Sequence, residues 1–117
     1  MKKSTKTLFI FQFLVLYSQF SISLSQTLSN NGTTCNVLSG ILITGGVINN
    51  TSGIISNAGT MTITDFSNIG TVNGIGDYNI SGNWVNDGTF SPSAGVVNFN
   101  GALNQTIGGT SQSSFYS

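Results

Sequence analysis

The chain has 117 residues, enough for one domain, and only 5% of them are charged. All three basic residues, Lys2, Lys3 and Lys6, lie at the amino terminus, and the sequence contains no arginine or histidine. Binding to nucleic acid or to anionic lipid depends on clustered Lys and Arg, so both classes of partner are excluded for the rest of the chain.

The first 25 residues have the pattern of a secretory signal peptide. The basic head is followed by an apolar run from Leu8 to Tyr17, and Ser23-Leu24-Ser25 offers small residues to a signal peptidase. We expect a helical signal peptide over residues 1–25, cleaved before Gln26, and hence a secreted or cell-surface protein. The alternative is a membrane anchor. It needs about 20 apolar residues, more than this run supplies, and no membrane span is expected after cleavage.

Residues 26–36 are polar and contain the turn signal Asn30-Asn31-Gly32, which predicts an introductory segment or cap. Val37–Thr44 is strongly apolar and lacks a helical stripe, so we predict one buried strand that Gly45-Gly46 breaks. Cys35 is the single cysteine and cannot form an intramolecular disulfide. A small, partly buried residue is favoured there over an intermolecular thiol.

A repeated corner organises residues 48–99. Asn57-Ala58-Gly59-Thr60, Asn68-Ile69-Gly70-Thr71 and Asn86-Asp87-Gly88-Thr89 share the pattern Asn-x-Gly-Thr. Because Asn and Gly tolerate positive φ, each copy can reverse the chain without steric cost. We therefore expect structural corners, in a positive-φ or another turn conformation, at Asn57, Gly59, Asn68, Gly70, Asn86 and Gly88.

Short segments rich in Ile, Val, Thr and aromatic residues separate the corners and favour extended backbone. Thr60–Thr64 alternates, so Met61 and Ile63 are predicted to face a core. Ile80 and Trp84 share one face of a later strand and are also predicted to point inward.

The spacing of these strands is shorter than a sandwich requires and favours stacked coils. The predicted fold is therefore all-β, a parallel β-helix or solenoid-like stack over residues 37–117. Its last coil, around Val96 to Ile107, is predicted to end in an open edge, which indicates a truncated repeat region.

The segment from Gly82 to Tyr116 resembles a repeat unit of large secreted, adhesin-like proteins of the Bacteroidota. Its Gly-Asn-Trp start is followed by Asn86-Asp87-Gly88-Thr89-Phe90, by Val97-Asn98-Phe99-Asn100-Gly101 and by Gln105-Thr106-Ile107-Gly108-Gly109. The resemblance implies a β-helix-like surface protein. Members of that family usually also carry a carboxy-terminal sorting domain, which this sequence does not show.

Few residues are suited to catalysis or to metal binding. The carboxylates are Asp65, Asp77 and Asp87, and no histidine, lysine or arginine follows residue 6 to serve as a general base or an oxyanion clamp. Gly74-Ile75-Gly76-Asp77 faintly resembles a calcium turn, but it occurs once, so an ordinary turn is favoured. We predict no enzyme activity, no metal and no cofactor.

The expected function is a non-catalytic, secreted or cell-surface structural or adhesin-like repeat protein, whose partners are surface polysaccharide or other copies of the chain. One alternative is a small polysaccharide- or ice-binding module that uses the row Thr60, Thr62 and Thr64. A weaker alternative is a fragment of a secreted polysaccharide lyase. Tyr78, Trp84 and Phe90 could form an aromatic sugar platform, although alternating aromatic residues are more often core.

Overall fold

The computed structural model describes residues 21–23 and 26–116, without the side chains of residues 21–23, 43 and 44. The predicted helical signal peptide lies outside these residues apart from the short strand β1 (Ser21–Ser23). The described part of the chain contains strands and turns and no helix, and therefore no helix able to span a membrane. The remaining strands are β2 (Thr27–Asn30), β3 (Thr34–Val37), β4 (Ile41–Asn49), β5 (Ile54–Asn57), β6 (Thr60–Asn68), β7 (Thr71–Gly74), β8 (Asp77–Ile80), β9 (Trp84–Asn86), β10 (Thr89–Pro92), β11 (Val97–Phe99) and β12 (Ile107–Gly108).

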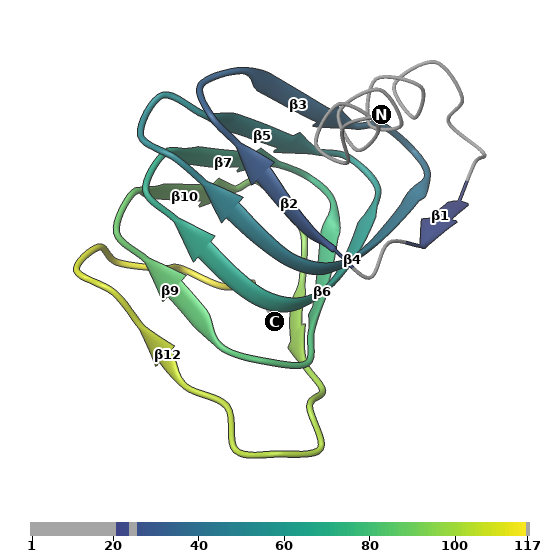
Figure 1. Ribbon diagram of the computed structural model, residues 1–117, viewed down its shortest axis with the longest axis vertical. Coiled ribbons are helices and arrows are strands. Elements are labelled where there is room, and N and C mark those ends of the chain that lie inside the picture. Colours follow the sequence, from purple (N-terminus) through teal and green to yellow (C-terminus); the bar gives the residue numbers. More distant parts are fainter. Residues whose placement is uncertain (1–20, 24–25, 117) are drawn as a thin grey trace.

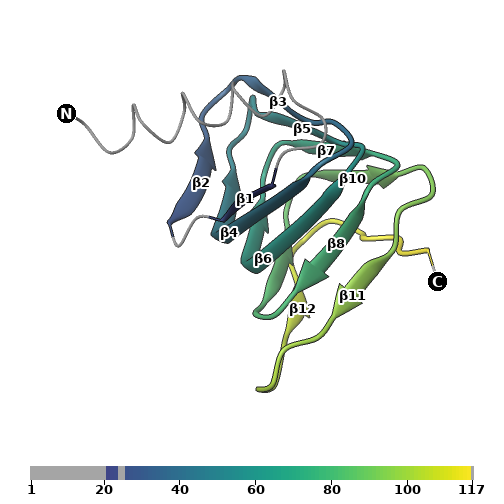
Figure 2. The same ribbon diagram turned by 90° about the vertical axis from the view of Figure 1, so that its right-hand side faces the viewer.

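The chain winds as a parallel β-solenoid, which confirms the predicted fold class. Strands β3, β5, β7 and β10 stack into one four-stranded sheet at the back of Figure 1. On the second side, the first half of β4 pairs with β6, β6 pairs with β8, and β8 pairs with β11. Figure 2 faces this side. The second half of β4 pairs with β2 and β6, and β9 and β12 continue that side. Each coil therefore contributes one rung to each of three sides.

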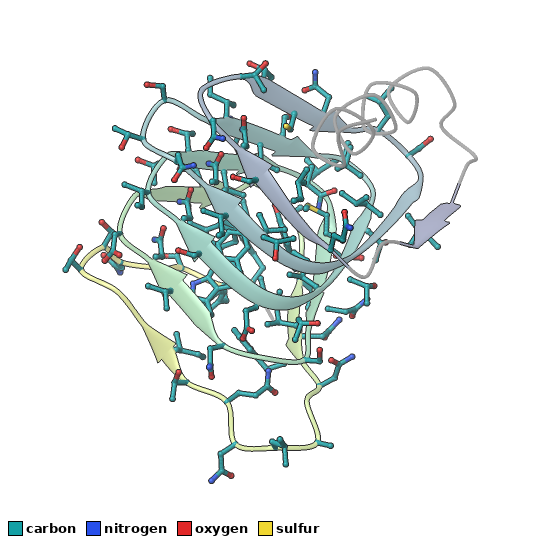
Figure 3. All side chains as sticks on the ribbon, viewed as in Figure 1. Atoms are coloured by element: carbon teal, nitrogen blue, oxygen red, sulfur yellow. The ribbon has the colours of Figure 1, made fainter. Side chains whose placement is uncertain are left out.

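Alternation along the strands sends one set of side chains into a continuous core, which the sticks of Figure 3 fill. The predicted inward residues Met61, Ile63, Ile80 and Trp84 are buried to 1% exposure or less. Trp84 stacks on Phe66 with ring centroids 4.0 Å apart. Phe90, Phe99 and Phe115 meet Trp84 edge-on, an arrangement that adds to the burial energy. Aromatic residues are therefore concentrated in the part of the core nearest the carboxy-terminal end of the stack.

A column of four buried asparagines runs through the interior at one corner of the stack. The Nδ2 atom of each of the first three donates to the Oδ1 atom of the asparagine one coil below, at 2.9, 2.8 and 2.8 Å, and the Nδ2 atom of the last donates to the Gln112 carbonyl at 3.1 Å. The column consists of Asn30, Asn49, Asn68 and Asn86, each at 1% exposure or less. We call it the asparagine ladder. It links four successive coils through side chains in addition to the backbone pairing.

The corners occur where the sequence predicts them, and of the two conformations predicted for the asparagines the one with positive φ does not occur. Within the described residues only glycines have positive φ: Gly32 at 97°, Gly74 at 115° and Gly109 at 114°. Asn57, Asn68 and Asn86 each end a strand and turn the amide inward. The corner positions 59, 70 and 88 require glycine for a reason other than positive φ. A Cβ atom on any of them would lie 2.2–2.3 Å from a carbonyl oxygen of the coil above.

Two predicted strand boundaries are also wrong. The predicted strand Val37–Thr44 is divided, because Val37 ends β3 and a corner at residues 38–40 precedes β4. Gly45-Gly46 does not break β4, which continues to Asn49. Residues 26–36, predicted as a cap, contain β2 and most of β3, which pair with β4 and β5. The apolar residues of Val37–Thr44 would look the same in one continuous strand as in the end of one strand, a corner and the start of the next. The sequence therefore could not show that a corner divides this segment.

Candidate functional site

The three aspartates share one structural role. The Oδ1 atom of Asp65 accepts from the Asn83 backbone N–H at 2.7 Å, that of Asp77 from Val96 at 2.9 Å, and that of Asp87 from Thr110 at 2.8 Å. In each case the bond connects one coil to the next. Because the three carboxylates are exposed and bind backbone amides separately, the structure brings no pair of them together by hydrogen bonding.

The predicted turn Gly74-Ile75-Gly76-Asp77 carries no second acidic residue. No group of three or more His, Cys, Asp or Glu residues that could hold a metal ion occurs in the part of the chain described. The Asp77 carboxylate is bonded to Val96, and the positive φ of Gly74 supplies the bend. This geometry is that of a solenoid corner.

The threonine row lies on the outer surface, as its alternation predicts. Thr60 and Thr62 are half-buried and Thr64 is exposed. The coil below places Asp77 and Asn79 beside Thr60 and Thr62. Asn79 in turn receives a hydrogen bond from Asn98 at 3.1 Å. The row of hydroxyls therefore does not repeat on the next coil, where amides bond to each other.

A second outer surface was not found from the sequence. The four-stranded sheet aligns two outward columns, and the side chains of both make no hydrogen bond with any described residue. We call this surface the back face. Its columns are Thr34, Ile54, Thr71 and Thr89, and beside them Asn36, Ser56, Asn73 and Ser91. Successive members are 20, 17 and 18 residues apart, so no fixed period in the sequence reveals them.

The outer side of β2, β4, β6 and β9, drawn in front in Figure 1, contains a hollow of about 340 Å³. Thr27, Gly46 and Asp65 occupy adjacent rungs of one outward column. Gly46 has no side chain, so the column is interrupted between its two neighbours. Ile48, Ser67 and Val85 form the adjacent column, and the other described residues of the lining are Gly45, Val47 and Phe66. We call this feature the Gly46 hollow.

The aromatic residues considered as a sugar platform belong to the core. Trp84 is fully buried, Tyr78 is 2% exposed and Phe90 is 7% exposed. The Trp84 indole N–H donates to the Ser113 hydroxyl at 3.0 Å, so its polar edge is also satisfied inside the protein. These rings present no face to a ligand, and the platform alternative is wrong.

Cys35 lies inward on β3 at 2% exposure, in agreement with the predicted small buried residue. Burial disfavours the thiolate and raises the pKa of the Cys35 thiol to about 11. A thiol in this state is a poor nucleophile at neutral pH.

Comparisons of the chain with protein-family models, with curated proteins and with solved structures find no match. The resemblance of Gly82–Tyr116 to adhesin repeats therefore stays a prediction. The fold and the outer surfaces of the stack are therefore the observations that bear on function.

Proposed function

We propose that this chain is an exported, non-catalytic, adhesin-like or structural repeat protein that makes its contacts through the outer surface of the stack. The observation that supports this most directly is the registered solenoid itself. Its core is occupied by apolar side chains and the asparagine ladder, so its functional groups are displayed on long outer sides.

The chemistry of the described residues favours contact over catalysis. Each carboxylate is committed to a backbone amide, and the one thiol is buried. The weaker alternative, a polysaccharide lyase fragment, would require a general base with a suitably raised pKa near a bound sugar. No feature of the described surface favours that alternative.

A localisation experiment tests the proposal. The full chain, produced in a bacterial host, is expected outside the cytoplasm, with Gln26 as its first residue and with the folded part open to added protease on intact cells. Amino-terminal sequencing and protease digestion provide the measurements. A chain retained in the cytoplasm with Met1 intact would contradict export.

The second candidate function is polysaccharide binding, with ice binding as its variant. The back face and the Gly46 hollow favour it. The back face offers hydroxyl and amide groups without partners among the described residues, and the hollow offers two such hydroxyls and the second carboxylate oxygen of Asp65. The threonine row supports ice binding less well, since the coil below interrupts it. Thermal hysteresis measurements distinguish ice binding from sugar binding. If the protein solution shows no more thermal hysteresis than buffer, ice binding is rejected, and sugar binding is then tested directly.

A further inference from the structure

We propose that the Gly46 hollow binds one sugar unit of a neutral polysaccharide. This inference rests on the proposed function and specifies where such a surface protein would hold its ligand. It differs from the binding row predicted from the sequence, because Thr60, Thr62 and Thr64 do not line the hollow.

The shape of the hollow comes from strand register. Thr27 lies opposite Gly46, and Gly46 lies opposite Asp65, on three adjacent parallel rungs. Rungs are about 4.8 Å apart, so Thr27 and Asp65 lie about two rungs apart, and the rung between them carries no side chain. The Gly46 backbone at the bottom of this space is buried. A Cβ atom placed on Gly46 would lie 3.4 Å from the Thr27 Oγ1 atom and 3.4 Å from the Asp65 carbonyl oxygen. A larger side chain at Gly46 would therefore fill the hollow.

Three side chains of the lining, Thr27, Asp65 and Ser67, have hydrogen-bonding capacity left for a hydroxylated ligand. One carboxylate oxygen of Asp65 holds the Asn83 N–H, and the other accepts no hydrogen bond from a described residue. The hydroxyls of Thr27 and Ser67 likewise have no partner there. A carboxylate accepts hydrogen bonds from sugar hydroxyls, and side-chain hydroxyls both donate and accept.

The apolar part of the lining suits the other surface of a sugar ring. Ile48, 41% exposed, and Val85, half-buried, lie on either side of Ser67 in the adjacent column. A sugar ring presents C–H groups on its faces and hydroxyls around its rim, which matches an apolar column beside a polar one. Concave sites with an apolar lining and few convergent polar groups are the usual ligand sites of proteins.

Charge selects the ligand further. Asp65 gives the hollow one negative charge, and none of the described residues that line it is basic. Phosphate, sulfate and uronate groups would be repelled by the carboxylate without compensation. An entirely apolar ligand would remove water from the carboxylate without replacing its hydrogen bonds. A neutral, hydroxyl-rich ring avoids both the charge repulsion and the loss of hydrogen bonds.

The test is an NMR titration of the full, exported chain with neutral hexasaccharides of glucose, xylose, mannose and N-acetylglucosamine. At least one sugar is expected to shift the backbone amides of Gly46, Ser67 and Val85 at millimolar concentration. Affinity is expected to fall about tenfold in Asp65→Asn, which removes the charged acceptor, and at least as much in Gly46→Val, which fills the space.

Two matched variants control for effects on the fold. Asp77→Asn changes an aspartate that holds a backbone amide in the same way as Asp65 but lies outside the hollow. Gly108→Val adds the same side chain to the same side of the stack, where a Cβ atom meets nothing within 4 Å. Both are expected to keep the affinity within about twofold. If Gly46→Val does not fold, Asp65→Asn and Ser67→Ala, each checked by circular dichroism, decide the matter.

The outcomes separate this inference from the proposed function. Shifts at the hollow that weaken only in the hollow variants support the inference. An exported chain in which no sugar shifts these amides, or in which Asp77→Asn weakens binding as much as Asp65→Asn, overturns the inference and leaves the proposed function intact. A chain that binds sugar at the hollow but stays in the cytoplasm contradicts the proposed function alone.

Discussion

An asparagine side chain carries two N–H donors and an oxygen that accepts two hydrogen bonds, so a column of asparagines can satisfy itself along a stack. In the ladder, Nδ2 of Asn68 donates to Oδ1 of Asn86 at 2.8 Å and to the Thr89 carbonyl at 3.0 Å. Among the described residues no buried side-chain nitrogen or oxygen lacks a partner. The ladder therefore places polar groups in the core without the cost of unsatisfied burial.

Removing one member of the ladder should be costly. Asn68→Ala would leave the Asn86 Oδ1 atom and the Thr89 carbonyl without their donor inside the protein. We expect a loss of about 3 kcal/mol in the free energy of unfolding. Asn98→Ala, which removes an exposed amide bonded at 3.1 Å, should cost less than about 0.5 kcal/mol. Urea denaturation measures both, and equal midpoints would show that the ladder contributes nothing to stability.

Only glycine fits at the corner positions, because neighbouring coils approach each other closely there. A Cβ atom on Gly88 would lie 2.2 Å from the Gly70 carbonyl oxygen, whereas one on Gly108 would meet nothing within 4 Å. We expect Gly88→Ala to lower the free energy of unfolding by about 1–3 kcal/mol and Gly108→Ala to change it by less than about 0.5 kcal/mol. Thermal melting of both variants checks this. A Gly88→Ala protein as stable as the parent would refute the close-approach explanation.

Burial of Cys35 predicts a loss of stability in alkali. Its pKa is raised from 9.0 to about 11 in the folded chain, so below pH 9 the thiol is neutral in both states. As the pH rises from 9 to 11, the unfolded chain releases the proton first, and stability falls by about 2 kcal/mol. Burial also raises the pKa of Tyr78 above 10.0, which extends the loss to higher pH.

Urea unfolding as a function of pH measures this effect. Cys35→Ala should flatten the curve between pH 9 and 10, while the Tyr78 contribution above that range remains. A Cys35→Ala protein with the same slope as the parent would assign the alkaline loss to another group.

Strands β4 and β6, nine residues each, turn from one side of the solenoid to the next without ending. The sequence predicted a break at Gly45-Gly46 because glycine pairs commonly end strands. The structure instead keeps the pairing on both sides of this position, with Ile41–Thr44 and Gly46–Asn49 both paired to β6. Because β4 continues through Gly46, this residue takes a place in an outward column and interrupts it. A predicted strand break at this position could not reveal the hollow.

Strand β1 belongs to the predicted signal peptide but pairs with Ile41–Ile43 of β4. Cleavage before Gln26 would remove it and expose that strand edge. β2, which begins after the predicted cleavage site, would keep its pairing with the second half of β4. The first coil therefore retains its three pairings with the next coil in the exported form: β2 with the second half of β4, β3 with β5, and the first half of β4 with β6.

Other copies of the chain are the second partner that the sequence predicts. β11 pairs only with β8, and β12 only with β9. Val96, directly before β11, makes an isolated parallel bridge to Tyr116, but β11 itself and β12 each have one edge without a strand partner among the described residues. Such edges favour association, and added lysine discourages it. We expect Asn98→Lys, on exposed β11, to reduce concentration-dependent association measured by light scattering.

Asn104→Lys adds the same charge on an exposed loop and serves as the control. If both variants, or neither, reduce association, the β11 edge is not its route. Gln105 is not a suitable site for lysine, because its side chain accepts from the Gly101 N–H and donates to the Ile80 and Gly82 carbonyls. A lysine there would destabilise the coil instead of protecting its edge.

At the scale of the whole molecule, the sequence was sufficient for fold class and for the positions of corners. Alternating apolar residues and recurring Asn-x-Gly corners identify stacked parallel strands, and Met61 and Trp84 point inward as predicted. The outer surface could not be predicted, because it depends on register between coils 17 to 20 residues apart. A shift of one residue in pairing would move every side chain to the opposite face.

The central claim is that the folded outer surface of the stack makes the contacts. Beads coated with the exported chain, placed under flow on a film of neutral polysaccharide or of the chain itself, test it most directly. We expect beads to be retained on at least one film, with retention lost when urea unfolds the chain and restored when the urea is removed. Retention that survives unfolding, or folded chains that hold to neither film, would contradict the claim.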